Sequence, residues 1–235
     1  VNSEPFHLLA KNTPLKIIEK HRNLFVIEAL LFGQAGFLVD EKDDEYSRRL
    51  KKEYHFLQSK FKLIPLDKSL WKFLRLRPAN FPTLRIAQLA HLLSNEPRIF
   101  SKVLEIDSVN ELQQLFSLTA SSYWNNHYQF GVEQKVTSQK RTGKLMIDSL
   151  IVNVVVPMLF VYATTTQNEE LKSKAIQFLE KLTSEKNTIL LNFEKLGIKS
   201  KNALQSQALI ELKTNYCSQK KCLTCSIGNN LLKTL

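Results

Sequence analysis

Apolar side chains recur at helical spacing through most of this chain. The clearest example lies within residues 43–61, where successive apolar positions are separated by steps of four, four, three and four: Tyr46, Leu50, Tyr54, Leu57 and Phe61. Such steps place side chains on one face of a helix. No stretch alternates with period two for long enough to predict a sheet. The pattern therefore predicts an all-α fold.

The same spacing predicts a single globular domain of about ten helices over residues 1–235, with a possible subdivision into 1–120 and 121–235. An apolar helix is predicted over residues 24–32. Gly33 and Gly36, which follow it, indicate either the end of the helix or a site of close packing. Pro78 and Pro82 prevent a regular helix around them and predict an ordered loop. Further helices are expected over residues 5–12, 14–21, 83–93, 97–105, 109–117, 168–182, 188–196 and 203–216.

Residues 118–142 lack helical periodicity, and the polar, basic stretch 134–144 is typical of a mobile loop. Residues 145–163, in contrast, are almost continuously apolar and reach about the minimum length of a membrane span. Asp148, Asn153 and Pro157 argue against a span, because a central acid costs about 2.5–3.5 kcal/mol on insertion. We expect a buried helix here, with a kink at Pro157, and no membrane partner.

The composition excludes several classes of protein. The hydrophobic fraction of 43% and the charged fraction of 23% are those of a globular protein. Six glycines and seven prolines are too few for an all-β sandwich or a Gly-rich nucleotide fold. Three cysteines do not make a disulfide framework, and the chain opens without a secretory leader, so we expect a cytoplasmic location.

The formal net charge of +11, from 33 Lys and Arg against 22 Asp and Glu, favours a phosphate-bearing partner such as nucleic acid. Arginines near the stiff double-proline loop resemble an anion site, because guanidinium groups bind phosphate oxygens bidentately. The alternative is that these side chains cap carbonyls and shape the turn. The candidate anion-binding residues are Arg75, Arg77, Arg85, Gln88, Lys140 and Arg141.

The three cysteines lie within nine residues near the end of the chain: Cys217, Cys222 and Cys225. Their C-x4-C-x2-C spacing contains the C-x2-C pair that recurs in zinc and iron–sulfur sites. A fourth ligand must come from elsewhere, and His127 is the best candidate because its neighbours indicate a polar turn. Zinc is favoured over an iron–sulfur cluster; redox chemistry and free structural thiols are the alternatives.

Catalytic motifs are missing. The chain has no G-x-S-x-G turn and no H-E-x-x-H helix, and no acid–base pair or activated nucleophile stands out. We therefore expect that this chain by itself is not catalytic.

Six strings, spread in order over the chain, resemble an uncharacterised bacterial family, the domain-of-unknown-function family numbered twenty-eight fifty-one. These strings are EALLFGQAGFL (28–38), RLRPANFPTLRIAQLA (75–90), SYWNNHYQFG (122–131), LIVNVVVPMLFVY (150–162), SQALIELK (206–213) and YCSQKKCLTCSIG (216–228). The resemblance implies that the chain is the C-terminal part of a longer protein, whose N-terminal part would be nuclease-like. The N-terminal domain of that longer protein would then be a partner of this chain.

Charge, cysteines and resemblance together suggest a basic helical accessory domain that binds nucleic acid beside a nuclease-like domain and carries a Cys-ligated metal. The alternative is a structural or self-associating interaction module without metal or catalysis. An enzyme is the third interpretation.

Overall fold

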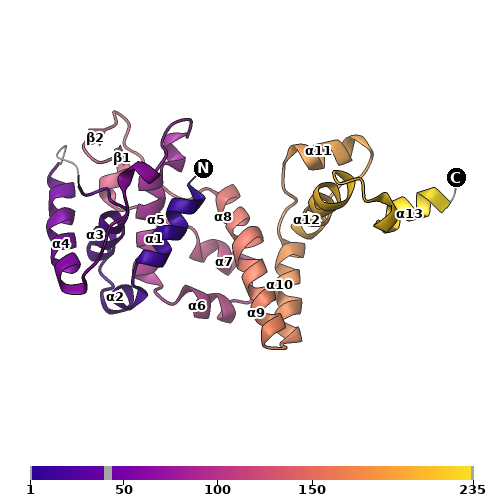
Figure 1. The fold of residues 1–235 in the computed structure, drawn as a ribbon, viewed down its shortest axis with the longest axis horizontal. Helices are drawn as coiled ribbons and strands as arrows, with labels where there is room; N and C mark the ends of the chain where they lie inside the picture. Colours follow the sequence, from indigo (N-terminus) through magenta and orange to yellow (C-terminus); the bar gives the residue numbers. More distant parts are fainter. Residues whose placement is uncertain (1, 40–43, 234–235) are drawn as a thin grey trace. The chain divides into compact units, whose positions relative to one another are not determined.

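The computed structural model describes residues 2–39 and 44–233, with side chains described up to residue 231. Helices dominate it, which confirms the all-α prediction. The chain divides into two compact units (Figure 1). The first comprises Val1–Ile106 and Gln114–Ile147, and the second comprises Asp107–Gln113 and Asp148–Leu235. Whether the chain is one domain, with a possible division at residue 120, stays a prediction.

The first unit is built mainly of helices, joined by 3₁₀ turns and one short hairpin. Its helices are α1 (Ser3–Asn12), α2 (Leu15–Lys20), α3 (Leu24–Gln34), α4 (Glu45–Phe61), α5 (Pro82–Asn95) and α6 (Ile99–Glu105). The 3₁₀ turns are Lys68–Leu70, Pro78–Asn80 and Ser122–Asn125, and the strands are β1 (His127–Gln129) and β2 (Val132–Glu133).

Helix α3 forms the centre of the first unit and packs against both α4 and α5. It is apolar almost all round, which is typical of a helix enclosed by other elements. Gly33 lets α3 approach α4, because its α-carbon faces the ring of Tyr54. Gly36 follows the helix with φ of +78°, and a side chain there would meet the Leu66 carbonyl. The predicted helix end and close packing are both confirmed.

The amphipathic helix predicted over 43–61 is α4; residue 43 lies outside the described residues. Asp44 caps it by accepting a hydrogen bond from the Ser47 amide at 2.8 Å. The double-proline stretch is irregular, as predicted, apart from the turn Pro78–Asn80.

The sequence pattern missed the hairpin. Strands β1 and β2 pair antiparallel, with His127 opposite Glu133 and Gln129 opposite Val132. The segment that follows is not a free loop, contrary to the prediction. Its backbone is held where Ser138 donates to the Asn125 carbonyl at 2.9 Å and where Lys140 accepts from Ala120 at 3.1 Å.

The second unit is helical, with two π-helical segments, at Ile151–Val155 and Leu212–Cys217. In it, α9 packs on α10, and α12 packs on both α10 and α11. Its helices are α9 (Val156–Thr165), α10 (Glu169–Lys181), α11 (Thr188–Lys195), α12 (Ala203–Glu211) and α13 (Ser226–Lys233); α7 (Val109–Leu115) and α8 (Lys144–Leu150) lie at the change from one unit to the other.

The apolar stretch expected as a buried helix is helical but not buried throughout. The continuous helix Lys144–Thr165 is long and apolar enough to cross a membrane by length and composition, and only 33% of its most apolar window is buried. Leu159 and Ala163 are buried, whereas Met158 and Val161 are 50% and 62% exposed. Pro157 follows the π-helical segment, where its missing amide removes a backbone hydrogen bond.

Candidate functional site

The double-proline loop packs against strand β1 through aromatic rings. The Phe81 ring lies 5.0 Å from that of Phe73 and 6.4 Å from that of Tyr128. Thr83, in the first turn of α5, donates its hydroxyl to the Tyr128 carbonyl at 2.5 Å. The double-proline loop and strand β1, which are far apart in sequence, therefore meet in the first unit.

Arg85 and Gln88 form the inner part of this region. The Arg85 guanidinium is partly buried and donates to Asn80 Oδ1 at 2.7 Å and to Gln88 Oε1 at 2.9 Å. Gln88 in turn donates to the Lys140 carbonyl at 3.4 Å. Burial lowers the pKa of Arg85. The contacts of both side chains stabilise the loop from inside, which is the structural alternative considered for them.

The other four predicted residues differ in exposure. Lys140 is buried, with its ammonium 2.9 Å from Ser138 Oγ and 4.4 Å from the Tyr128 ring centroid, a cation–π contact. Arg75, Arg77 and Arg141 are exposed. Among the described residues, no ion-pair partner contacts Arg75 or Arg77. The structure thus leaves three guanidinium groups of the predicted site open to solvent.

Positive charge is concentrated in the first unit. Over the sequence, that unit holds 22 Lys and Arg against 13 Asp and Glu, whereas the second holds 11 against 9. The net charges are therefore +9 and +2. A polyanion is attracted mainly to the first unit, where the exposed arginines lie.

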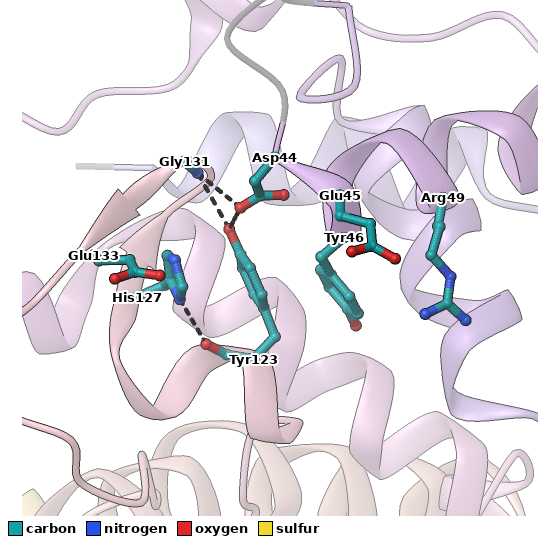
Figure 2. Close-up of a pocket in the computed structure, with 8 residues that line it drawn as sticks. All are labelled: Asp44, Glu45, Tyr46, Arg49, Tyr123, His127, Gly131 and Glu133. Carbon is teal, nitrogen blue, oxygen red and sulfur yellow. Dashed lines mark hydrogen bonds between the residues drawn. The ribbon is translucent and has the colours of Figure 1, made fainter.

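A cleft of about 520 Å³ lies between the first turn of α4 and the hairpin (Figure 2). Three planar rings are stacked at it: Tyr46 on Tyr123 at 4.3 Å, and Tyr123 on His127 at 4.1 Å between centroids. Its lining residues are Asp44, Glu45, Tyr46, Arg49, Tyr123, His127, Gly131 and Glu133.

Asp44 ties the hairpin to α4. Besides capping α4, its carboxylate accepts a short hydrogen bond from the Tyr123 hydroxyl and another from the Gly131 amide at 3.1 Å. Burial acts to raise the pKa of Asp44, but the bonds from Ser47, Tyr123 and Gly131 outweigh it and hold that pKa below its ordinary value. Burial, and then the bond to Asp44, raises the pKa of Tyr123. At neutral pH the pair is a carboxylate and a neutral phenol.

Glu28 of α3 supports the same cleft from inside the core. It is fully buried and accepts a short hydrogen bond from the Tyr46 hydroxyl and one from Ser121 at 3.3 Å. Burial raises the pKa of Glu28, although the bonds from Tyr46 and Ser121 offset part of the rise. The Tyr46 ring is thus anchored at its hydroxyl as well as by stacking.

His127 was expected in a polar turn; it is instead the first residue of β1 and only 6% exposed. Its Nδ1 lies 2.9 Å from the Tyr123 carbonyl oxygen. A carbonyl only accepts, so we infer that Nδ1 donates this hydrogen bond, while the second ring nitrogen, Nε2, has no hydrogen-bond partner among the described residues. In Figure 2 that second nitrogen points away from the Tyr123 carbonyl, toward the side of the cleft that holds Gly131 and Glu133. The acids and tyrosines of this cleft carried no motif that the sequence analysis could use.

The three cysteines lie in the second unit and are free thiols. Cys217 ends a π-helical segment, Cys222 opens a 3₁₀ turn, and Cys225 precedes α13. Within the described part of the chain, no group of three or more His, Cys, Asp or Glu side chains is placed to hold a metal ion. Zinc, an iron–sulfur cluster and His127 as fourth ligand stay predictions.

Metal content tests the cysteine prediction directly. For anaerobically purified protein we expect about one zinc per chain, because two thiolates separated by two residues in a turn can bind the same ion. The double variant Cys222→Ser and Cys225→Ser should lose it in elemental analysis. A brown absorption spectrum would indicate a cluster instead, and metal-free protein with an unchanged variant would leave the cysteines as structural thiols.

Comparison with known families assigns the chain. A family model described as a protein of unknown function, DUF2851, matches residues 1–188. The chain belongs to the DUF2851 family. No curated protein and no solved structure matches it. The DUF2851 match includes the double-proline loop and the cleft but ends before Cys217, so the cysteines lie outside the part of this DUF2851 member that the family model covers.

Proposed function

We propose that the first unit of this DUF2851 member binds nucleic acid. The binding site is the Arg–Pro surface, which we define by five residues with exposed or partly exposed side chains: Arg75, Arg77, Phe81, Tyr128 and Arg141. One observation carries the proposal. The double-proline loop and Lys140, distant in sequence, meet at the Tyr128 ring: the Phe81 ring lies 6.4 Å from it and the Lys140 ammonium lies 4.4 Å from its centroid.

The chemistry of the Arg–Pro surface suits a phosphate backbone. Its exposed guanidinium groups have several N–H donors each, and neutralising phosphates releases counterions. The same surface includes the partly exposed rings of Phe81 and Tyr128, and aromatic rings stack unpaired bases in proteins that bind single strands. The net charge of +9 on this unit adds long-range attraction.

The backbone of Arg75 gives independent support. Its φ of +63° lies in the left-handed region, where a residue other than glycine costs about 1–2 kcal/mol. Glycine would adopt this conformation without strain. An exposed arginine held there at a cost to stability is consistent with a use for its guanidinium outside the fold.

The test is the double variant Arg75→Gly and Arg77→Ala. Glycine removes the Arg75 guanidinium and relieves the backbone, so the fold should be kept. We expect binding to a fluorescent oligonucleotide, measured by anisotropy, to weaken by about tenfold or more, and the slope of log affinity against log salt to fall by about two. Single-stranded and duplex oligonucleotides are compared, because stacking favours the single strand.

A matched control removes two cations elsewhere. Lys16 and Lys20 are exposed on α2, at the end of the first unit opposite the hairpin (Figure 1). The variant Lys16→Ala and Lys20→Ala should lose only the small part of the oligonucleotide affinity that comes from the overall net charge. Equal losses in both variants, or no measurable binding by the wild type, would contradict the proposal.

An interaction module is the second candidate, and the exposed apolar side chains of α9 favour it. It predicts self-association in sedimentation experiments at micromolar concentration, independent of Arg75 and Arg77. A monomer that binds oligonucleotides would decide for the first candidate. Placement beside a nuclease-like domain in the cytoplasm belongs to the same proposal and is not needed for this test.

A further inference from the structure

The cleft between α4 and the hairpin is negative within a strongly positive unit. Among the described residues, three carboxylates line it, Asp44, Glu45 and Glu133, against a single cation, Arg49. The Arg49 guanidinium also lies over the Phe25 ring, 5.3 Å from its centroid. We propose that this cleft binds a small organic cation whose head group is a guanidinium or a primary ammonium.

The carboxylates are available to a ligand. Glu45 and Glu133 are exposed, and among the described residues neither forms an ion pair. Asp44 is different, because its carboxylate already accepts hydrogen bonds from Ser47, Tyr123 and Gly131 and thereby connects the walls of the cleft. Glu45 and Glu133 lie on opposite sides of the Tyr123 ring in Figure 2, so they offer acceptors on two sides of the cleft.

His127 is the second, independent indication of a ligand. Its side chain is more than nine-tenths buried and lines the cleft. Its Nδ1 donates to the Tyr123 carbonyl, and its Nε2 has no hydrogen-bond partner among the described residues. A buried ring nitrogen without a partner in the protein, at the wall of a cleft, can form a hydrogen bond with a ligand.

The hydrogen-bond acceptors at the cleft determine which chemical class of ligand it can bind. An anion would meet three carboxylates, so it would be repelled. A metal ion is disfavoured, because within the described residues no three ligands are arranged around one point. Guanidinium and ammonium groups supply several N–H donors and a positive charge, which match carboxylate and imidazole acceptors.

The walls of the cleft are held by contacts within the protein. The rings of Tyr46, Tyr123 and His127 are stacked, and the hydrogen bonds of Asp44 connect α4 to the hairpin. A volume of about 520 Å³ falls within the usual range of small-molecule sites. The cleft shares no lining residue with the Arg–Pro surface, although Glu133 also lines a neighbouring pocket with Tyr128 and Lys140, and its ligand binding does not depend on nucleic acid.

Agmatine, which carries one guanidinium and one ammonium group, is the probe. Calorimetric titration of the whole chain, without nucleic acid, should show binding. Glu133→Gln should weaken it by about tenfold, because the change removes one charged acceptor and keeps the shape. Tetramethylammonium, a cation without N–H donors, should bind at least about tenfold more weakly than agmatine.

Glu19→Gln is the matched control, because Glu19 is an exposed acid on α2 of the same unit. We expect its agmatine affinity to stay within about twofold of the wild type. Absence of agmatine binding up to about 10 mM would overturn the proposal. An equal loss in Glu19→Gln, or equal affinity for tetramethylammonium, would show only general attraction of cations and would overturn it as well.

Discussion

Replacing Gly33 with alanine is expected to lower the free energy of unfolding by about 3 kcal/mol or more. A Cβ at this position would lie 2.0 Å from Cδ2 of the Tyr54 ring. The ring cannot easily move, because Tyr54 is 4% exposed and its hydroxyl donates to Gln34 at 2.7 Å. In an isolated helix the same substitution would stabilise by about 1 kcal/mol, so tertiary packing reverses the sign.

Urea unfolding followed by tryptophan fluorescence measures this effect in the first unit, where both Trp71 and Trp124 lie. Gly143→Ala is the control, because a Cβ at Gly143 meets nothing within 4 Å; it should change stability by less than about 0.5 kcal/mol. If the clash is the cause, the double variant Gly33→Ala and Tyr54→Ala should lose less free energy of unfolding than the two single variants together, by at least about 1 kcal/mol. Strict additivity would contradict the proposed contact.

Trp124→Ala is expected to destabilise the first unit by about 3–5 kcal/mol, the second large effect. Trp124 is fully buried, and its ring lies 5.2 Å from that of Phe32 and 5.1 Å from those of Phe130 and Tyr123. Truncation leaves a cavity at the junction of α3, the turn Ser122–Asn125 and the hairpin. The remaining Trp71 reports the unfolding transition by its fluorescence.

Phe56→Ala is the matched aromatic truncation on the surface, because Phe56 is 58% exposed on α4. It should cost no more than about 1 kcal/mol. Similar losses for Trp124→Ala and Phe56→Ala would show that Trp124 is not in a packed core. Trp124→Phe should fall between them, because the smaller ring refills part of the cavity.

Local features of the fold could be predicted where the signal is itself local. The steps from Tyr46 to Phe61 predicted α4, because residues three and four apart share a helix face whatever surrounds them. Gly33 and Gly36 were recognised as positions of close packing or helix termination, but the partner of Gly33, Tyr54, lies on another helix. The hairpin was missed because its strands are too short to show an alternating pattern.

Packing gives part of the predicted anion site a structural role instead. Sequence grouped Arg85 and Lys140 with the exposed arginines, because all are basic residues in loop-like surroundings. The structure partly buries Arg85 against Asn80 and Gln88 and places Lys140 on the Tyr128 ring. The division into units also locates the excess of positive charge, because the first unit has a net charge of +9 and the second of +2.

By itself, the sequence determined that this protein is helical, basic and a member of DUF2851, because periodicity, charge and family motifs can be read along the chain. Only the tertiary structure decided which polar groups meet. Glu28, Asp44, Tyr123 and His127 come from three separate segments, and their contacts form when α3, α4 and the hairpin pack together. Spacing along a chain carries no record of such long-range contacts, so the cleft could not be predicted from it.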